Sequence, residues 1–361
     1  MEPVPKVGNV VITTAKGMKY LPALLSSIAR QTYADHETTV VVDGGDGAVV
    51  EYLKGEWPEL HVVPIAEAGG FARAIDSGVR SSRGEYIGIL NDDVELEPDW
   101  LAQLVAELDR DPDVGFATGK TMLYDDRDLI NEANQDVYSC GRFVPRGLLE
   151  KDVGQYDEPG PTTVASASAS VYRRAAVVRA GGFDTDYGIY CEDADLCLRM
   201  ILSGYRGRYV PAAVAYHAWS PTVGRTSETS LLLGNRNMLA TLFKDFPASV
   251  LARSLPKIVR YQWWTYRSAR ATHWARTLLR AWIGFLGMLP ATLRKRRRLQ
   301  SRRAISSREF EAFLMTGYPD LPPVQRDPAE LRRFSPARLR LVALDIRRRR
   351  RMRGGTGSSG Q

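Results

Sequence analysis

The chain has 361 residues, 44% of them apolar, so it is long enough to bury a core of domain size. Its net charge of +7 is unevenly distributed: residues 1–250 hold 23 basic and 36 acidic side chains, whereas residues 251–361 hold 26 and 6. No run of about 20 apolar residues predicts a membrane-spanning helix. We expect one large domain at 1–250 and an appendage that faces a different partner.

Apolar runs alternate with helical patterns through the first part of the chain. The pattern predicts strands at 10–12, 39–42, 62–65 and 86–90, and helices at 20–31, 71–82 and 97–108. This repetition indicates a mostly parallel central sheet flanked by helices, the Rossmann-like arrangement of the α/β class. From 114 to 172 the pattern loosens around a polar loop at 125–157, which we expect beside an active cleft.

The composition changes after Phe246-Pro247. Six tyrosines and tryptophans alternate with five arginines between 260 and 282, and an apolar helical stripe at 278–289 precedes the basic run 294–298. We therefore expect residues 251–353 to form a basic, aromatic-rich helical extension that contacts an anionic membrane surface, and 354–361 to form a disordered tail. The alternative is that the aromatic side chains pack onto the first domain while the arginines stay solvated.

The sequence also bears on nucleic acid as a partner and on the cellular compartment. The arginine run 347–351 has no motif that reads nucleic acid, and the first domain is acidic, so we expect no nucleic acid partner. Cys140, Cys191 and Cys197 form no CxxC pair, which favours a reducing compartment over a disulfide framework or a zinc site. Residues 1–6 lack a signal pattern, so we expect a cytoplasmic protein, peripheral at the inner face of the cell membrane.

Acidic residues stand where apolar runs end. Asp43 follows one predicted strand, Asn91-Asp92-Asp93 follows another, and Glu192-Asp193-Ala194-Asp195 opens a helix. Because ligands bind at the carboxyl ends of strands in open α/β sheets, these carboxylates are expected to converge on one cleft. Such a cleft predicts a divalent cation and a charged substrate. Asp193 and Asp195 point about 200° apart around their helix, so one faces the reaction and the other is structural.

In their order and spacing these residues resemble the inverting family 2 glycosyltransferases of the GT-A fold, especially the rhamnosyltransferase-like bacterial branch. The resemblance covers about residues 7–245. Its motifs are Val10-Val11-Ile12-Thr13-Thr14, Val41-Val42-Asp43-Gly44, Gly70-Phe71-Ala72-Arg73-Ala74, Asn91-Asp92-Asp93, Gly181-Gly182-Phe183-Asp184, Glu192-Asp193-Ala194-Asp195-Leu196, His217 and Arg236-Asn237. The chain departs from the family at Ala68 and Asp76, where asparagine is usual, so no side-chain contact is expected from position 68.

The resemblance implies that nucleotide sugar is bound by Thr13, Asp43, Arg73, Asn91 and Asp92. The Asp43 carboxylate would accept a hydrogen bond from a ring N–H of uracil or thymine; an Asx turn that closes the strand is the structural alternative. Arg73 and the backbone amides that begin its helix would hold part of the nucleotide sugar. Asn91 can hydrogen-bond ribose but offers no charge, and Asp92 would hold ribose or the strand end.

The resemblance also implies a metal site. Asp93 would bind Mg²⁺ or Mn²⁺ that bridges the diphosphate of the donor, and His217 would be the second ligand from the protein. A hard cation offsets the repulsion between a diphosphate and a carboxylate-rich cleft. An imidazole ligand would favour Mn²⁺, whereas a purely structural histidine is the alternative.

The resemblance places the general base at Asp193, which would take the proton of the acceptor hydroxyl as its oxygen attacks the anomeric carbon. Glu192 or Asp195 would bind acceptor hydroxyls; alternatively, these acids only complement the positive end of their helix. Arg225 and Arg236 would neutralise the departing diphosphate once a loop at 218–230 closes, although either can equally be a surface cation.

The expected function is metal-dependent, inverting transfer of a sugar, with rhamnose as the first choice, from a dTDP- or UDP-sugar. The acceptor would be a hydroxyl of a cell-envelope glycan or of a polyprenyl-diphosphate-linked molecule. One alternative, a sugar nucleotidyltransferase, needs a glycine-rich basic loop after the first strand, which residues 13–17 lack. The other is an inactive scaffold that binds glycan or membrane, against which the presence of Asp93, Asp193 and His217 argues.

Overall fold

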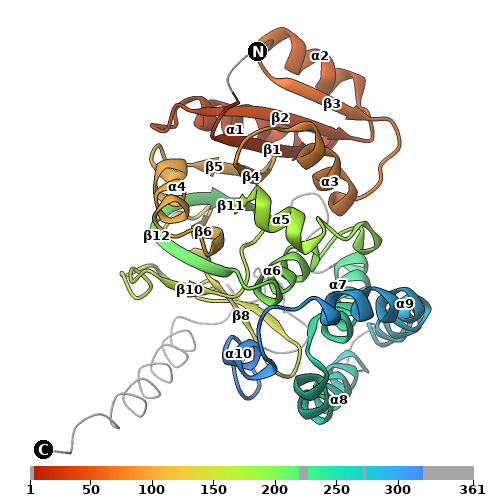
Figure 1. The fold of residues 1–361 in the computed structure, drawn as a ribbon. Coiled ribbons are helices and arrows are strands. Elements are labelled where there is room, and N and C mark those ends of the chain that lie inside the picture. Colours follow the sequence, from red (N-terminus) through yellow and green to blue (C-terminus); the bar gives the residue numbers. More distant parts are fainter. Residues whose placement is uncertain (1–3, 219–226, 271–273, 320–361) are drawn as a thin grey trace, which may run out of the picture. The chain divides into compact units, whose positions relative to one another are not determined.

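The computed structural model describes residues 4–218, 227–270 and 274–319. Its central element is a ten-stranded sheet with the order β10-β12-β6-β11-β4-β1-β2-β3, to which β5 adds on β12 and β7 on β6 (Figure 1). The strands of this sheet are β1 (Val7–Thr13), β2 (His36–Asp43), β3 (His61–Ile65), β4 (Tyr86–Asn91), β5 (Val94–Leu96), β6 (Val114–Leu123), β7 (Ile130–Ala133), β10 (Gly160–Thr162), β11 (Ala169–Arg173) and β12 (Arg206–His217). The strands β8 (Gln135–Val137) and β9 (Phe143–Pro145) form a separate hairpin.

The predicted α/β class is confirmed. The strands β3, β2, β1 and β4 are parallel to their neighbours, so Asp43 and Asn91 end their strands at the same edge of the sheet. Beyond β4 the sheet becomes mixed: β11 lies antiparallel between β4 and β6, and β12 runs parallel to β6. This mixed part comes from the region where the sequence pattern loosened, and no strand direction could be predicted there.

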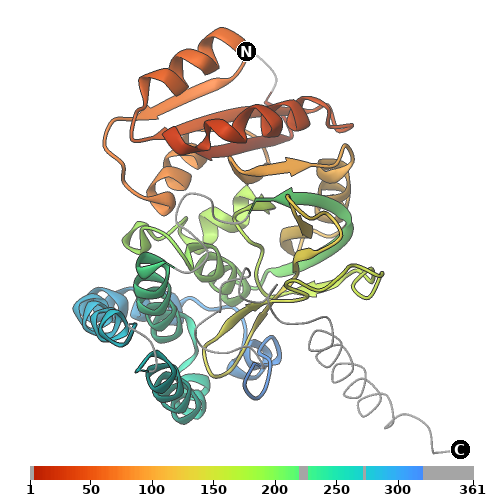
Figure 2. The same cartoon turned by 180° about the vertical axis from the view of Figure 1, so that it is seen from behind.

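Helices cover both faces of the sheet. They are α1 (Leu21–Ala29), α2 (Gly47–Glu56), α3 (Phe71–Ser81), α4 (Trp100–Arg110), α5 (Arg174–Ala180), α6 (Glu192–Leu202), α7 (Glu228–Asp245), α8 (Ala248–Arg270), α9 (Ala275–Ser301) and α10 (Ser307–Ala312), with two 3₁₀ turns, η1 (Ala15–Lys19) and η2 (Thr185–Tyr187). Alternate residues of β1 point to opposite faces: Val10 and Ile12 join the core under α3, α5 and α6, and Val11 joins the core under α1 and α4. Figure 2 shows the sheet and its helices from behind.

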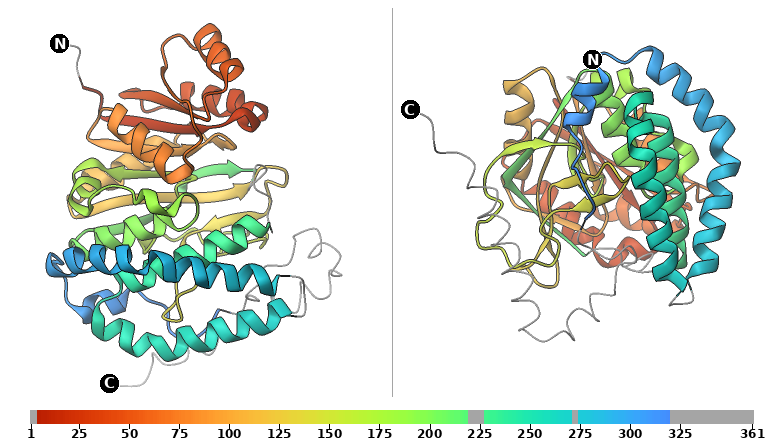
Figure 3. Two further views of the ribbon diagram at one scale, coloured as in Figure 1. Left: turned by 90° about the vertical axis from the view of Figure 1, so that its right-hand side faces the viewer. Right: turned by 90° about the horizontal axis from the view of Figure 1, so that it is seen from below.

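The predicted domain boundary near residue 250 does not separate two cores. Val250 and Ile258 from α8 and Phe285 from α9 belong to the same buried cluster as Leu196 of α6, and a single compact unit runs from Met1 to Pro323. Figure 3 shows α7, α8 and α9 lying beside one another in this unit. Residue 250 therefore marks a change in surface composition, and the packing alternative describes the inner faces of α8 and α9.

The remaining C-terminal expectations lie outside the described residues. These are the end of the predicted extension, the arginine run 347–351 and the tail 354–361. Among the helices that the structure does describe, none combines the length and the apolar character needed to cross a bilayer.

Candidate active site

Asp93 and His217 face each other at one edge of the sheet. Antiparallel pairing of β5 with β12 sets His217 opposite Val94, and the Ala218 amide donates to the Asp93 carbonyl oxygen at 2.9 Å. His217 Nε2 lies 3.2 Å from Asp93 Oδ1, and this oxygen has no hydrogen-bond partner. Both side chains are buried.

Asn131 fixes the orientation of the His217 ring. Its Oδ1 atom lies 3.0 Å from His217 Nδ1, and because an amide oxygen only accepts, this contact suits the tautomer with a proton on Nδ1. In that tautomer Nε2 presents a lone pair toward Asp93. Two electron-pair donors at this separation fit two ligands of one cation, and an outer hydrogen bond to a histidine is usual at metal sites.

Asp92 is held from the other side by β1 and η1. The Thr14 amide donates to Asp92 Oδ2 at 3.3 Å, and a methyl group at Gly17 would lie 1.7 Å from that oxygen, so only glycine allows this approach. Burial raises the pKa of Asp92 to about 6, although hydrogen bonds from Thr13 and Thr14 oppose the shift. Asp92 therefore supports the strand end and the η1 turn.

A short segment between β10 and β11 joins Asp193 to the Asn91 end of β4. The Ala167 amide donates to Asp193 Oδ2 at 3.1 Å, and the Asn91 amide donates to the carbonyl oxygen of Ser168 at 2.9 Å. The acid at the start of α6 and the Asn-Asp-Asp motif are thus held by two consecutive residues. The structure brings these two predicted parts of the site together.

Asp193 is surrounded by further acidic groups. Burial raises its pKa, while the Ala167 and Ala194 amides lower it. Burial and the Asp193 charge also raise the pKa of Glu192 well above its usual range and that of Glu132, on β7, to about 8. Glu192 Oε2 is buried without a hydrogen-bond partner.

The backbone before Asp193 is strained. Tyr190 and Cys191 have φ angles of 73° and 67°, a region that residues other than glycine rarely adopt. The Asn237 amide nitrogen donates to the carbonyl oxygens of Tyr187, Ile189 and Tyr190 at 2.8–2.9 Å and so holds this conformation.

The predicted arginines have other placements. Arg236 Nη2 donates to the Tyr187 carbonyl oxygen at 2.9 Å, so its guanidinium supports the same strained loop; its contact with the diphosphate stays a prediction. Arg225 lies outside the described residues.

The nucleotide-side residues lie at the edge of the parallel strands. Asp43 Oδ1 accepts a hydrogen bond from the Gly69 amide at 2.9 Å. The Arg73 side chain covers Gly69, where a methyl group would lie 2.3 Å from Arg73 Cδ. Asn91 Oδ1 is buried without a partner. Buried oxygens without partners are rare in folded proteins and mark places where a ligand is expected.

Asp195 cannot bind an acceptor in this structure. It is fully buried, and its carboxylate pairs with Arg199 at 2.6 Å and with Lys244 at 2.5 Å. Burial opposes its ionisation, but these two charges hold the pKa of Asp195 well below the usual range. Asp195 is therefore the structural member of the Asp193–Asp195 pair, and the prediction that it binds acceptor is corrected.

Asn131, Glu132 and the Ala167 backbone were not predicted as site residues. Asn131 and Glu132 stand side by side on β7, in the loop 125–157 that the sequence placed near the cleft, but polar residues are common in such a loop. Ala167 acts through its backbone amide, which any residue except proline supplies. The residue type at this position therefore could not predict the hydrogen bond to Asp193.

In the part of the chain that the structure describes, no group of three or more His, Cys, Asp or Glu side chains is arranged to hold a metal ion by itself. Asp93 and His217 supply two ligand atoms. A cation here would complete its shell with oxygens from a ligand or from water, as Mg²⁺ in phosphate sites usually does.

The sheet and the acidic residues at its edge define the class of the protein as a GT-A glycosyltransferase fold. Residues 9–179 match the model of the glycosyl transferase family 2. These residues therefore form a glycosyltransferase domain of family 2 type.

The chain is also similar to several curated proteins. The chain is 28% identical over 237 residues to the uncharacterized protein y4gI of Sinorhizobium fredii, a match that covers 62% of this chain and 26% of that protein. It is 27% identical over 216 residues to the uncharacterized glycosyltransferase YwdF of Bacillus subtilis, covering 59% of this chain and 74% of that one. It is 24% identical over 253 residues to the N-acetylglucosaminyl-diphospho-decaprenol L-rhamnosyltransferase of Mycobacterium tuberculosis, covering 62% and 79%.

Solved structures agree in fold. GalNAc-T7 with UDP, GalNAc and Mn²⁺ superposes with a TM-score of 0.60 at 14% identity, covering 86% of this chain and 57% of that one. Residues 1–349 of Staphylococcus aureus TarS superpose with a TM-score of 0.54 at 16% identity, covering 82% and 83%.

Asp195→Ala should destabilise the protein by about 3–5 kcal/mol, because it leaves the buried Arg199 without its carboxylate partner and leaves Lys244 with Asp184 alone. Urea unfolding measures this loss. Asp186→Ala is the control, since Asp186 is half exposed and pairs only at the surface, and it should cost less than about 1 kcal/mol. Equal, small costs for both variants would contradict the structural role of Asp195.

Glu132→Gln should raise the melting temperature more at pH 9 than at pH 6. The folded protein holds the Glu132 proton up to about pH 8, whereas the unfolded chain releases it near the usual value of 4.5. Wild-type stability therefore falls as pH rises between these values, and glutamine removes that loss. Calorimetry should show that the gain in melting temperature caused by the substitution is larger at pH 9 than at pH 6 by about 2 °C or more. The exposed-site variant Glu59→Gln should show no such pH dependence.

Proposed function

We propose that the protein transfers a sugar from a nucleotide sugar to an acceptor hydroxyl with inversion at the anomeric carbon. The observation that carries the proposal is the joint support of Asp193 and the Asn91–Asp93 motif by Ala167 and Ser168. A base on one side of the sugar and a diphosphate site on the other are what an in-line displacement requires. The family 2 domain supports the same reaction.

Asp93 and His217 are the proposed ligands for Mg²⁺ or Mn²⁺. Their facing oxygen and nitrogen atoms, the unpartnered Asp93 Oδ1 and the Asn131 hydrogen bond fit a cation. When bound with the donor diphosphate, the cation would offset negative charge on the leaving group.

Asp193 is the proposed general base. Its Oδ1 and Oδ2 atoms accept hydrogen bonds from the Ala194 and Ala167 amides, which orient the carboxylate while burial makes it a better proton acceptor. It takes the proton of the acceptor hydroxyl; the acceptor oxygen forms the new bond to the anomeric carbon, and the bond to the diphosphate oxygen breaks. Glu192, with one free buried oxygen, is the proposed contact for acceptor hydroxyls.

Nucleotide sugar is proposed to lie along the edge formed by β1, β2 and β4. Asp43 retains one carboxylate oxygen for the base, since Gly69 uses the other. Asn91 Oδ1 is free for ribose, Arg73 is exposed at the helix start, and Thr13 with Asp92 supports the strand ends.

The proposed donor is a dTDP- or UDP-sugar, with dTDP-rhamnose first, and the proposed acceptor is a cell-envelope glycan or a polyprenyl-diphosphate-linked molecule. The relative named as an N-acetylglucosaminyl-diphospho-decaprenol L-rhamnosyltransferase supports rhamnose as the sugar and a polyprenyl-diphosphate-linked molecule as the acceptor. The proposed location is the cytoplasmic face of the membrane. In support of membrane contact, α9 exposes Leu279, Ile283, Leu286 and Leu293 on one side, ahead of its basic end.

Asp193→Asn should lower turnover by about 10²-fold or more, because the amide keeps the shape of the side chain but cannot take a proton. Initial rates with a panel of nucleotide sugars measure turnover, and calorimetry should show nearly unchanged donor binding. Asp186→Asn, an exposed acid of the neighbouring η2 turn, is the matched control. Unchanged turnover in Asp193→Asn would refute the base assignment.

Asp93→Ala should abolish the part of nucleotide binding that depends on Mn²⁺. Calorimetric titrations with UDP and dTDP, each with Mn²⁺ and with chelator, measure it. The wild type and the exposed-site control Asp128→Ala should bind at least about ten-fold more tightly with the metal. Equal affinity with and without Mn²⁺ in the wild type would exclude this metal site.

A further inference from the structure

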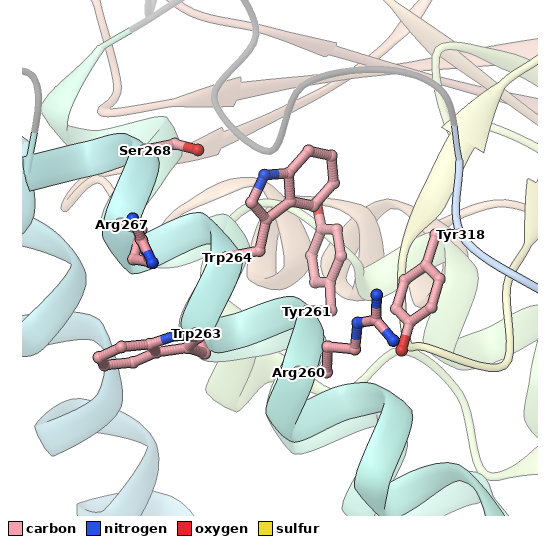
Figure 4. A pocket seen from close by; sticks show the side chains of 7 residues that line it. All are labelled: Arg260, Tyr261, Trp263, Trp264, Arg267, Ser268 and Tyr318. Atoms are coloured by element: carbon pink, nitrogen blue, oxygen red, sulfur yellow. The ribbon is translucent and has the colours of Figure 1, made fainter.

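The outer side of α8 carries a cavity that the proposed reaction does not use. It has a volume of about 690 Å³ and is lined by Arg260, Tyr261, Trp263, Trp264, Arg267, Ser268 and Tyr318. Figure 4 shows Arg260 beside the Tyr318 ring and Trp264 beside Tyr261. The Arg260 guanidinium carbon lies 5.3 Å from the centre of the Tyr318 ring. Two cations and several aromatic rings thus share one cavity.

The two arginines of this cavity have no carboxylate partner among the described residues. Tyr261 is 1% exposed, yet its hydroxyl makes no hydrogen bond; the nearby Thr265 hydroxyl donates to the Tyr261 carbonyl oxygen instead. No described carboxylate pairs with Arg260 or Arg267, whereas Arg253, one further heptad back on α8, pairs with Glu311 at 2.6 Å. Two exposed arginines without carboxylate partners, beside aromatic rings, fit an anionic ligand.

The surface beside the cavity is apolar. Leu255, Val259 and Trp263 are spaced four residues apart, so they form one row along α8, and they are 43%, 59% and 58% exposed. Trp264 is exposed as well. Contiguous exposed apolar side chains flanked by arginines, with tryptophan at the border, are typical of surfaces that meet the headgroup region of a membrane.

Arg142 lies near both a residue of the cavity and the start of α6. Burial raises the pKa of both the Tyr261 hydroxyl and the Cys191 thiol, and the charge of Arg142 opposes both shifts. Arg142 is therefore within range of both groups, and Cys191 is two residues from Asp193.

We propose that the α8 cavity binds the phosphate group of a membrane lipid. Arg260 and Arg267 take the negative charge, and the apolar row of Leu255, Val259 and Trp263 meets the lipid chains. The binding of a lipid phosphate to the α8 cavity does not depend on the proposed function; only the biological role of this binding rests on the proposed lipid-linked acceptor. The shared chemistry is a phosphate on an apolar tail, which both a bulk phospholipid and a prenyl diphosphate carrier present.

The test is calorimetric titration of the full chain with water-soluble probes below their micelle concentrations. Dihexanoyl phosphatidic acid and farnesyl diphosphate combine phosphate with an apolar tail, dihexanoyl phosphatidylcholine carries no net charge, and inorganic phosphate has no tail. At least one of the first two should bind at a single site about ten-fold or more tighter than the last two. The tighter of the two identifies the source as bulk lipid or prenyl carrier. Equal binding of inorganic phosphate, or no binding of either tailed phosphate, would overturn the proposal.

Point variants localise the site. Arg260→Gln with Arg267→Gln should weaken binding of the tailed phosphate by about 30-fold, the effect expected for two arginines at a lipid phosphate. Arg297→Gln with Arg298→Gln removes the same charge from the exposed end of α9 and should change affinity less than about three-fold. Equal losses in both double variants would show non-specific attraction and overturn the site.

Binding of nucleotide with Mn²⁺ to the same wild-type sample tests the proposed function separately. Binding of nucleotide without binding of lipid phosphate would refute only the α8 site. Binding of lipid phosphate without binding of nucleotide would refute only the proposed sugar transfer.

Discussion

The arrangement of the site depends on two backbone hydrogen bonds made by consecutive residues. Ala167 donates to the carboxylate of Asp193, and Ser168 accepts from the amide of Asn91. Because β11 begins immediately afterwards and pairs with β4, this connection is built into the sheet. Fixed backbone dipoles offset the electrostatic repulsion between the acidic groups. These dipoles need no reorganisation when charge moves during a reaction. The strained residues before α6, fastened by Asn237, complete the same support.

The parallel half of the fold followed directly from the sequence, because βαβ units leave an alternation of apolar runs and helical stripes. The mixed half did not: β11 and β12 take their direction from contacts between residues far apart in the chain, which local patterns do not record. The helix α2 was also missed, since it buries only Val49 and Leu53 and its start depends on the Asp46 cap. The change of composition near 250 does not mark a change of core for a related reason: composition reports the surface of α8 and α9 and not the core that they share with α6.

Candidate site residues were predictable where a motif joins a carboxylate or imidazole to a strand or helix end, as at Asp93, Asp193 and His217. Asn131 and Glu132 were not, because only folding of the loop 125–157 sets them beside these groups. The two carboxylates of the α6 motif illustrate the limit most clearly. Helical spacing showed that one must be structural, but only the contacts with Arg199 and Lys244 showed that it is Asp195.

The common core of α6, α8 and α9 restricts how this protein can work at a surface. A catalytic domain on a flexible linker can take many distances from a bilayer. The helix α8, in contrast, shares its core with α6 and cannot move independently of the active site. If α8 rests on lipid, Asp193 stands at a constant elevation above it. The number of sugar units between the anchor of an acceptor and its reacting hydroxyl would then be selected by the dimensions of the fold, so the protein would act as a ruler for glycan length.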